Sequence, residues 1–463
     1  MDYFSNDEEK INRAKNKRKS FLPIVFILVI LLIAGIIYAI KDDVFSENYY
    51  GPGMTTEEKS KETTTTERNK NNSGAKNSET EEEDVDASIT SSLEDDAIAT
   101  IASPLEDDVS ATIASPSVGA KHREPDAIST SSFISKSITT NNKDIDTLVF
   151  AGDIYFSKRN INAYDDGGVY KVLQKDYIDI IDDHDFFVAN LECCLTDADE
   201  ASNKEFTFKV SPKYVSILKD MHIDLVTVAN NHAMDYGEKG FLETLDSLNK
   251  SGIDYYGGGK DENEATKPYV LEINGRKYAL ISATSVVPNV NWFANTERAG
   301  LNSGYYGNAV CNQIKAIKDK VDKVIVYIHW GVEKDTVSNE DQQTMGRKFV
   351  DFGADLVVGT HSHRLQEVEY YKNVPIVYGI GNFIFGSTWT DTEILSIGFD
   401  YTDNKKGKTK IKLVPGTCGY ELTSVLSTEQ KRNKFILDNI IPKSPTCILD
   451  DDGYIIKNPG LVE

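Results

Sequence analysis

The stretch ADLVVGTHSH, residues 354–363, combines a short apolar run with two histidines. A continuous apolar run of this length predicts a strand that is buried on both faces. His361 and His363 follow directly after the run, although the whole chain contains only 7 histidines. In open α/β sheets, ligands bind outside the carboxyl ends of the strands. The stretch therefore predicts a buried strand that ends at a functional site with two imidazole groups.

Six other segments have the same short apolar character, and helical segments separate several of them. They are TLVFAGD (147–153), FFVANLE (186–192), DLVTVANNH (224–232), KYALISAT (277–284), KVIVYIHWG (323–331) and PIVYGIGNF (375–383). Segment 211–221 begins with the helix-starting pair Ser-Pro, and segments 238–252 and 341–353 end on a glycine suited to a helix C-terminus. Two runs at 394–401 and 408–416 predict a β-hairpin. We therefore expect an α/β fold, or an α+β layered one.

Polar side chains stand at the ends of most of these predicted strands. They are Asp153, Glu192, Asn231 with His232, His329, and His361 with His363. A single histidine at a strand end is usually a satisfied polar residue, but here four of the 7 histidines fall at the ends of apolar runs. Neutral imidazoles and carboxylates together suit Zn, Mn or Fe(II), and a carboxylate can bridge two cations about 3.5–4 Å apart. The pattern predicts a site for one or two divalent metal ions.

Six motifs occur in an order and at a spacing that resemble the CapA/PgsA family of capsule-synthesis proteins. They are AGDIYF, NLE, ANNHAMDYG, HWGVEKD, GADLVVGTHSHRLQEVE and PIVYGIGNFIF, between about 148 and 390. That family is linked with poly-γ-glutamate capsule production and has a calcineurin-like metallophosphatase fold. The resemblance implies a β-sandwich flanked by helices in the head of the chain.

The resemblance also implies a role for each motif residue. One metal ion would be held by Glu192, Asn231, His329 and His361, and a second by Asp153, Glu192 and His363. Glu192 stands where a bridging aspartate is usual. His232 matches the histidine that steadies or protonates a phosphoryl oxygen, with Asp235 orienting it.

The chain departs from the family pattern at two positions. The metallophosphatase first motif has a histidine two residues after its aspartate, but this chain has Tyr155. The second metal ion would therefore have one imidazole fewer. Cys193 replaces the family's glycine after NLE, either as a thiolate ligand or as a small buried side chain. Cys418 and Cys447 are candidates for a disulfide or for buried free thiols.

The first 40 residues predict a membrane anchor. Residues 21–40 carry no charge, and a helix of that length spans about 30 Å, the thickness of a bilayer core. The basic run KNKRK (15–19) precedes them, which predicts a cytoplasmic N-terminal tail (1–20) and an extracellular remainder. A cleaved signal peptide is the alternative, but the apolar run is long and no clear cleavage site follows it.

Residues 41–145 predict a disordered, acidic, extracellular stalk in front of a folded head at 146–463. They contain 22 acidic and 10 basic residues, a net charge of −12 within a chain total of −23. They also hold two copies of a 12-residue repeat, at 93–104 and 105–116. Such a composition cannot bury enough apolar area to offset its chain entropy. The acidic balance argues against a nucleic-acid partner.

Two classes of function follow from the resemblance. The favoured one is a role in the synthesis or export of poly-γ-glutamate beside membrane-embedded capsule synthase components, in which Lys158, Arg159 and Arg364 would meet the carboxylates of the polymer. The alternative for all three is ordinary surface charge. The runner-up function is a cell-surface, metal-dependent phosphoesterase, either a nucleotidase or a phosphodiesterase, in which His232 and Asp235 would be catalytic. Whether the head is an enzyme stays open in the sequence.

Overall fold

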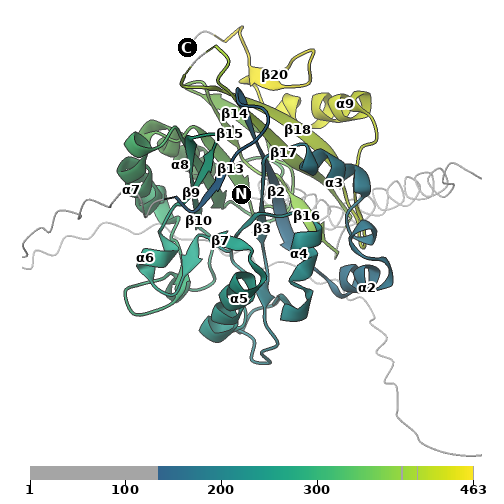
Figure 1. The fold of residues 1–463 in the computed structure, drawn as a ribbon, viewed down its shortest axis with the longest axis vertical. Helices are drawn as coiled ribbons and strands as arrows, with labels where there is room; N and C mark the ends of the chain where they lie inside the picture. The colour runs from purple at the N-terminus through teal and green to yellow at the C-terminus, as the bar shows by residue number, and fades with distance from the viewer. Residues whose placement is uncertain (1–133, 387–388, 404, 462–463) are drawn as a thin grey trace, which may run out of the picture. The chain divides into compact units, whose positions relative to one another are not determined.

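The computed structural model describes residues 134–386, 389–403 and 405–461 (Figure 1). The predicted cytoplasmic tail, the predicted membrane helix at 21–40 and most of the predicted stalk lie outside these ranges. Within them, no helix combines the length and the apolar character that crossing a membrane requires. The fold begins before residue 146, because β1 (Lys136–Ile138) pairs in parallel with β9 (Tyr269–Ile273). The last part of the range assigned to the stalk is therefore part of the head.

Two large sheets make up the described part of the chain. The seven-stranded sheet has the order β1-β9-β10-β12-β13-β15-β14, and the ten-stranded sheet has the order β20-β21-β18-β17-β2-β3-β6-β7, with β16 beside β2 and β19 beside β18. The first sheet adds β10 (Arg276–Thr284), β12 (Lys323–His329), β13 (Leu356–Thr360), β14 (Val368–Tyr371) and β15 (Val374–Val377). The second comprises β2 (Ile145–Tyr155), β3 (Phe186–Leu191), β6 (Leu225–Thr227), β7 (Asp254–Tyr256), β16 (Asn382–Phe385), β17 (Thr390–Asp400), β18 (Lys408–Cys418), β19 (Thr423–Val425), β20 (Cys447–Leu449) and β21 (Ile455–Lys457). Two small pairs, β4 (Cys194–Leu195) with β5 (Lys209–Val210) and β8 (Gly258–Gly259) with β11 (Gly300–Leu301), complete the strands.

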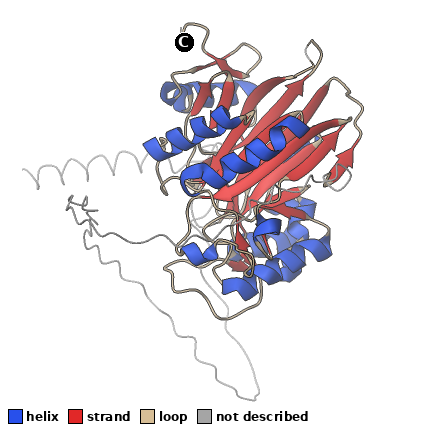
Figure 2. Cartoon of the chain, turned by 90° about the vertical axis from the view of Figure 1, so that its left-hand side faces the viewer, coloured by secondary structure: helices blue, strands red, loops and turns tan. Residues whose placement is uncertain are grey.

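The sheets pack face to face and helices cover their outer faces (Figure 2). The core between the sheets takes Leu148 and Phe150 from one sheet and Leu280 and Ile325 from the other, all fully buried. Burying a side chain of this size stabilises a fold by about 1.5–3 kcal/mol. The helices are α2 (Lys158–Gly167), α3 (Lys175–Asp182), α4 (Ser216–Asp220), α5 (Gly237–Ser251), α6 (Glu262–Ala265), α7 (Asn308–Ile317), α8 (Glu340–Phe352) and α9 (Glu429–Asn439).

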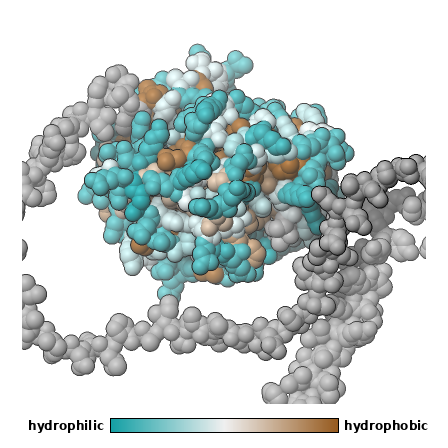
Figure 3. Space-filling model, turned by 90° about the horizontal axis from the view of Figure 1, so that it is seen from below, coloured by the Kyte–Doolittle hydropathy of each residue, from teal (hydrophilic) through white to brown (hydrophobic). Residues whose placement is uncertain are grey.

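Separate outer cores tie the helices to the sheets. Side chains of α3, α4 and α5 pack on the ten-stranded sheet, and side chains of α7 and α8 pack on the seven-stranded sheet. The face seen in Figure 3 is mostly hydrophilic, and its hydrophobic residues form small separate patches. The predicted layered α/β architecture, a β-sandwich flanked by helices, is confirmed.

Most of the expected elements are present. The helix predicted at 238–252 is α5, and the helix predicted at 341–353 is α8; Gly252 and Gly353 end them with φ of 68° and 116°. Positive φ costs glycine little because it has no Cβ. The predicted hairpin is β17 with β18, which pair in antiparallel over their whole length. Segment 211–221 forms one 3-10 turn followed by the short helix α4.

The single strand expected at 375–383 is wrong. The segment forms β15 in one sheet and β16 in the other, so the chain crosses between the sheets at residues 378–381. Gly381 allows this crossing with a φ of 67°, and its carbonyl accepts a hydrogen bond from the Asp153 N–H at 3.1 Å. A Cβ on Gly152 would lie 1.8 Å from that carbonyl oxygen, so the close approach requires glycine there.

Candidate metal centre

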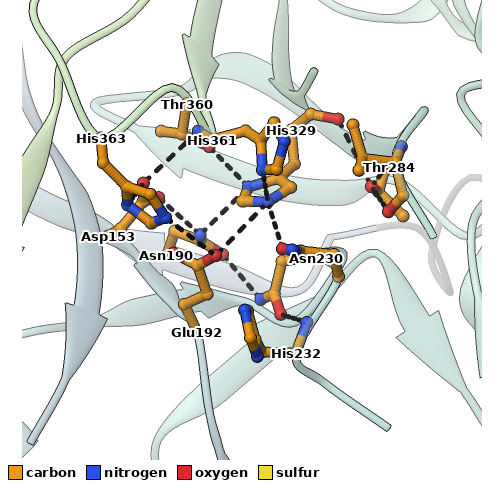
Figure 4. A network of polar contacts seen from close by, with 12 residues as sticks. Asp153, Asn190, Glu192, Asn230, His232, Thr284, His329, Thr360, His361 and His363 are labelled. Carbon is orange, nitrogen blue, oxygen red and sulfur yellow. Dashed lines mark hydrogen bonds and ion pairs between the residues drawn. The ribbon is translucent and has the colours of Figure 1, made fainter. Parts of the chain in front are cut away.

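The polar residues at the strand ends meet at one place between the two sheets (Figure 4). The ten-stranded sheet supplies Asp153 from β2, Glu192 from the end of β3, and Asn231 with His232 from the loop after β6. The seven-stranded sheet supplies His329, the last residue of β12, and His361 with His363 from the loop after β13. Because β2, β3 and β6 run parallel, as do β10, β12 and β13, their carboxyl ends reach a common edge.

One group of ligand atoms surrounds the Nε2 atom of His329. Asn231 Oδ1 lies 2.8 Å from it, and His361 Nδ1 lies 3.0 Å from it. Glu192 Oε1 lies 3.5 Å from the same nitrogen. The ligand atoms of Glu192, His329 and His361 all lie within 4.8 Å of one another. This is the set that the resemblance implies for the first metal ion.

A second group shares Glu192 and adds Asp153 and His363. His363 Nδ1 lies 3.3 Å from Asp153 Oδ2, and His363 Nε2 lies 4.0 Å from Glu192 Oε1. The resemblance implies this same set for the second metal ion, and the set contains one imidazole, that of His363.

The backbone of the HSH motif is strained to reach this arrangement. The φ angles of His361 and His363 are 95° and 54°, in a region that non-glycine residues rarely adopt. Such strain costs about 1–3 kcal/mol for each residue and gathers at functional sites. With these backbone angles, the imidazoles of His361 and His363 lie beside Glu192 and Asp153.

The residues fit a cation. Both carboxylate oxygens of Glu192 are buried without a hydrogen-bond partner, and its exposed fraction is 0%. Burial and the nearby carboxylate of Asp153 raise the pKa of Glu192 well above its usual value. Burial lowers the pKa of His329 well below its ordinary value, and it lowers the pKa of His361 to about 3. A buried carboxylate facing neutral imidazoles is a donor set suited to Zn, Mn or Fe(II).

Hydrogen bonds around the ligands fix their orientation. His329 Nδ1 lies 3.0 Å from the Thr360 hydroxyl. When Nδ1 carries the proton and donates to this hydroxyl, the lone pair of Nε2 is free to bind a cation. Asn190 donates to Asp153 Oδ1 at 2.8 Å, and Asn230 donates to Asn190 Oδ1 at 2.9 Å. Asn382 Oδ1 lies 2.7 Å from His363 Nδ1. The sequence reasoning missed these residues, although Asn190 and Asn230 lie inside the motifs NLE and ANNH.

His232 lies beside the candidate ligands (Figure 4), and its Nδ1 atom faces Asp235. That nitrogen lies 2.7 Å from Asp235 Oδ2, which matches the orienting role expected of Asp235. Lys204, which the sequence reasoning missed, pairs with Asp235 Oδ1 at 2.7 Å and lies 3.2 Å from His232 Nδ1. Burial lowers the pKa of His232, and the hydrogen bond to Asp235 opposes that shift.

Tyr155 packs among aromatic rings. Its ring stacks on Phe208 with 4.3 Å between centroids and meets the edge of Phe385 at 5.6 Å. Cys193 is 1% exposed, and burial raises the pKa of its thiol well above the ordinary value. Neither group of candidate ligand atoms includes the Cys193 sulfur. Cys418 and Cys447 are both buried free thiols, so they form no disulfide.

The three basic residues predicted to meet the substrate lie in different surroundings. Arg364 follows His363 and donates from Nη1 to its carbonyl at 3.0 Å, so its backbone adjoins the centre. Lys158 and Arg159 are exposed in the first turn of α2. The Arg159 guanidinium lies 4.8 Å from the ring centroid of Tyr420.

Comparisons with known proteins show the class to which the chain belongs. The chain belongs to the bacterial capsule synthesis protein family PGA_cap, whose model matches residues 147–387. It is 29% identical over 322 residues to the PGA biosynthesis protein CapA of Bacillus subtilis (strain 168), covering 69% of this chain and 83% of that protein. It is 28% identical over 258 residues to the capsule biosynthesis protein CapA of Bacillus anthracis, covering 53% of this chain and 61% of that protein.

Two solved structures show a partial similarity to the fold of this chain. The NAD nucleotidase of Haemophilus influenzae has a TM-score of 0.39 and 14% identity, covering 65% of this chain and 63% of that chain. The calcineurin-like phosphoesterase YfkN from Bacillus subtilis has a TM-score of 0.37 and 14% identity, covering 64% of this chain and 96% of that chain. Scores of this size support no conclusion about the activity of this chain.

Proposed function

We propose that the chain is a membrane-anchored protein of the outer cell surface that handles poly-γ-glutamate as it leaves a membrane-embedded synthase. We propose further that its head holds one or two divalent metal ions in a metallophosphatase-type centre. Membership of the capsule-synthesis family supports the role in the capsule. The apolar segment at 21–40 and its basic flank support the anchor.

The observation that carries the metal centre is Glu192. A carboxyl group that is fully buried without a hydrogen-bond partner is very costly to ionise in a protein interior. A cation beside Glu192 removes that cost, because it attracts the carboxylate that both ligand groups share. His329 and His361 would then hold one ion together with Asn231, and His363 and Asp153 would hold the other.

The residues around the centre can bind and position an anionic group. A bound divalent cation polarises a carboxylate or phosphoryl oxygen. His232 keeps Nδ1 against Asp235, so its Nε2 can accept or return a proton at the centre. Lys204 holds Asp235 in place through the ion pair at 2.7 Å. The same pair, His232 with Asp235, is what favours the second candidate function, a cell-surface phosphoesterase.

Removing the gene from its host tests the role in the capsule. Loss of surface polyglutamate, restored by the intact gene, is the expected result, and an unchanged surface would refute the proposal.

The purified full chain, supplied with Mn²⁺ or Zn²⁺, separates the two candidate functions. Turnover of a generic phosphodiester would support the phosphoesterase. Full metal content with no turnover of phosphodiesters or γ-glutamyl chains would remove the enzyme readings and leave a binding role.

A further inference from the structure

A surface loop, residues 196–208, joins β4 to β5 beside the metal centre. Its two ends lie side by side because Cys194 pairs with Lys209 and Leu195 pairs with Val210. Compact loops with adjacent ends are often functional. None of residues 197–208 is buried. By contrast, His329 is 1% exposed and His361 is 4% exposed.

Phe208 at the end of this loop belongs to a row of rings that includes two imidazoles of the candidate site. Its ring stacks on the imidazole of His232, with 4.0 Å between centroids and an interplanar angle of 23°. Phe385 meets the Phe208 ring at 5.5 Å and the imidazole of His363 at 4.8 Å. The row therefore runs without a break from His232 to His363, which is one of the candidate ligands.

A buried carboxylate fastens the loop in this position. Asp235 is 0% exposed, and its Oδ1 accepts from Lys204 Nζ at 2.7 Å. Its Oδ2 accepts from the Phe208 N–H at 2.7 Å, and its carbonyl accepts from the Ser202 N–H at 2.7 Å. Lys204 Nζ also donates to the Asn231 carbonyl at 2.7 Å. These contacts bind the loop directly to the Asn-His motif.

The loop is the part of the enclosure that costs least to move. The ligands stand on or beside the ends of β2, β3, β12 and β13, whose side chains are buried almost throughout. Moving those strands would expose the core, whereas lifting the loop breaks the ion pair of Lys204, the contacts of the Phe208 ring with three neighbouring rings and a few hydrogen bonds. Segments with few buried apolar contacts open locally at low free energy.

We propose that residues 196–208 form a gate over the metal centre, with Lys204 and Phe208 as its latch. In the structure the contacts of the latch are all formed. A cation enters or leaves, and an anionic ligand reaches His232, when the latch releases and the loop lifts. This inference rests on the proposed metal centre and adds a control of access to it.

The release of metal from the full-length chain tests the gate. The protein is loaded with Zn²⁺ and mixed with an excess of a chromogenic chelator, and the rate of transfer is recorded. Phe208→Ala should release Zn²⁺ about 5- to 10-fold faster than the unmodified chain, because the substitution removes the aromatic contacts of the latch. Phe206→Ala is the matched control, because Phe206 lies on the same loop and is 61% exposed. Lys204→Met should also release the ion faster.

Equal release rates for Phe208→Ala and Phe206→Ala would overturn the gate while leaving the metal centre intact. Amide hydrogen exchange is the second measurement and needs no metal. The amides of Ser202 and Phe208 should exchange faster than those of β3, and exchange of loop and strand at one common rate would also overturn the gate. If the unmodified chain binds no metal, the proposed metal centre fails, and the gate over it fails as well.

Discussion

At the scale of single residues, the proposed metal centre depends on side chains whose chemistry can be read from the sequence. The distances between those side chains cannot be read from it. The histidines, Asp153 and Glu192 were readable because each follows a short apolar run. The sequence does not single out Asn190, Thr360 and Lys204, because amide, hydroxyl and ammonium side chains are common near strand ends and in loops. Lys204 lies 31 residues from Asp235 in the chain, and no spacing rule connects them.

His361→Ala should reduce the metal content of the full chain. The imidazole lies 3.0 Å from His329 Nε2, and its loss removes a donor from the group that has two histidines. We expect the affinity for Zn²⁺ to fall by about 10- to 100-fold or more, since even supporting residues of metal sites have effects of that size. Elemental analysis and calorimetric titration measure the change. His222→Asn is the control, because His222 is an exposed histidine paired with Asp182; equal losses in both variants would contradict the assignment.

Tyr155→His should raise the occupancy of the group formed by Asp153, Glu192 and His363. The substitution restores the imidazole that the metallophosphatase pattern has two residues after its aspartate. Elemental analysis of the unmodified chain should give fewer than two equivalents of metal, and the variant should give more than the unmodified chain. Two full equivalents in the unmodified protein would show that Tyr155 does not stand for a missing ligand.

At the scale of elements, the sequence predicts most of the strands and the polar residues at their ends. It does not predict which strand belongs to which sheet. An apolar run such as PIVYGIGNF has the same pattern whether it lies in one sheet or crosses between two. The crossing is decided by Gly381 and Gly152, whose backbones approach more closely than any Cβ allows. A glycine in a run marks a position where this can happen, but it does not name the partner strand. Local periodicity thus gives the elements, and tertiary contacts decide their pairing.

Strand β17 contains a buried acid that should make stability depend on pH. Glu393 is fully buried, and neither of its carboxylate oxygens has a hydrogen-bond partner. Burial raises its pKa from 4.5 to about 8, and the nearby ammonium of Lys443 only partly opposes the shift. A carboxyl whose pKa is raised by folding stabilises the folded state below its unfolded pKa. That stability is lost as the pH rises toward the folded pKa.

The ionisation of Glu393 should therefore lower the free energy of unfolding by up to about 3–5 kcal/mol between pH 4.5 and pH 8. Glu393→Gln removes the ionisation while keeping the shape of the side chain. We expect the variant to be more stable than the unmodified chain at pH 8 and to lose less stability between pH 5.5 and pH 8. Urea denaturation at the two pH values measures this, and parallel pH profiles for the two proteins would refute it.

At the scale of the whole molecule, the candidate ligands of the proposed metal centre come from both sheets. Asp153, Glu192 and Asn231 come from the ten-stranded sheet, and His329, His361 and His363 come from the seven-stranded sheet. A ligand that binds only the folded state stabilises it by about 2.7 kcal/mol when its concentration is 100 times its dissociation constant. Chelation should therefore lower the midpoint of thermal unfolding, and His361→Ala should shrink that shift. A midpoint unaffected by chelation would exclude a metal ion that bridges the sheets.

The N-terminal segment should fix the whole chain to the membrane with the head outside. Residues 21–40 have the length and the lack of charge of a membrane helix, and the five residues before Ser20 are KNKRK. We expect the full chain in the membrane fraction of its host, and a chain lacking residues 21–40 in the soluble fraction. Protease added to intact cells should remove the head and leave a tag at the N-terminus protected. Replacing the basic residues of KNKRK with glutamine should weaken this orientation, because lysine and arginine hold the short flank in the cytoplasm. A head that stays protected in intact cells would contradict the topology, and with it the encounter between the head and an exported polymer.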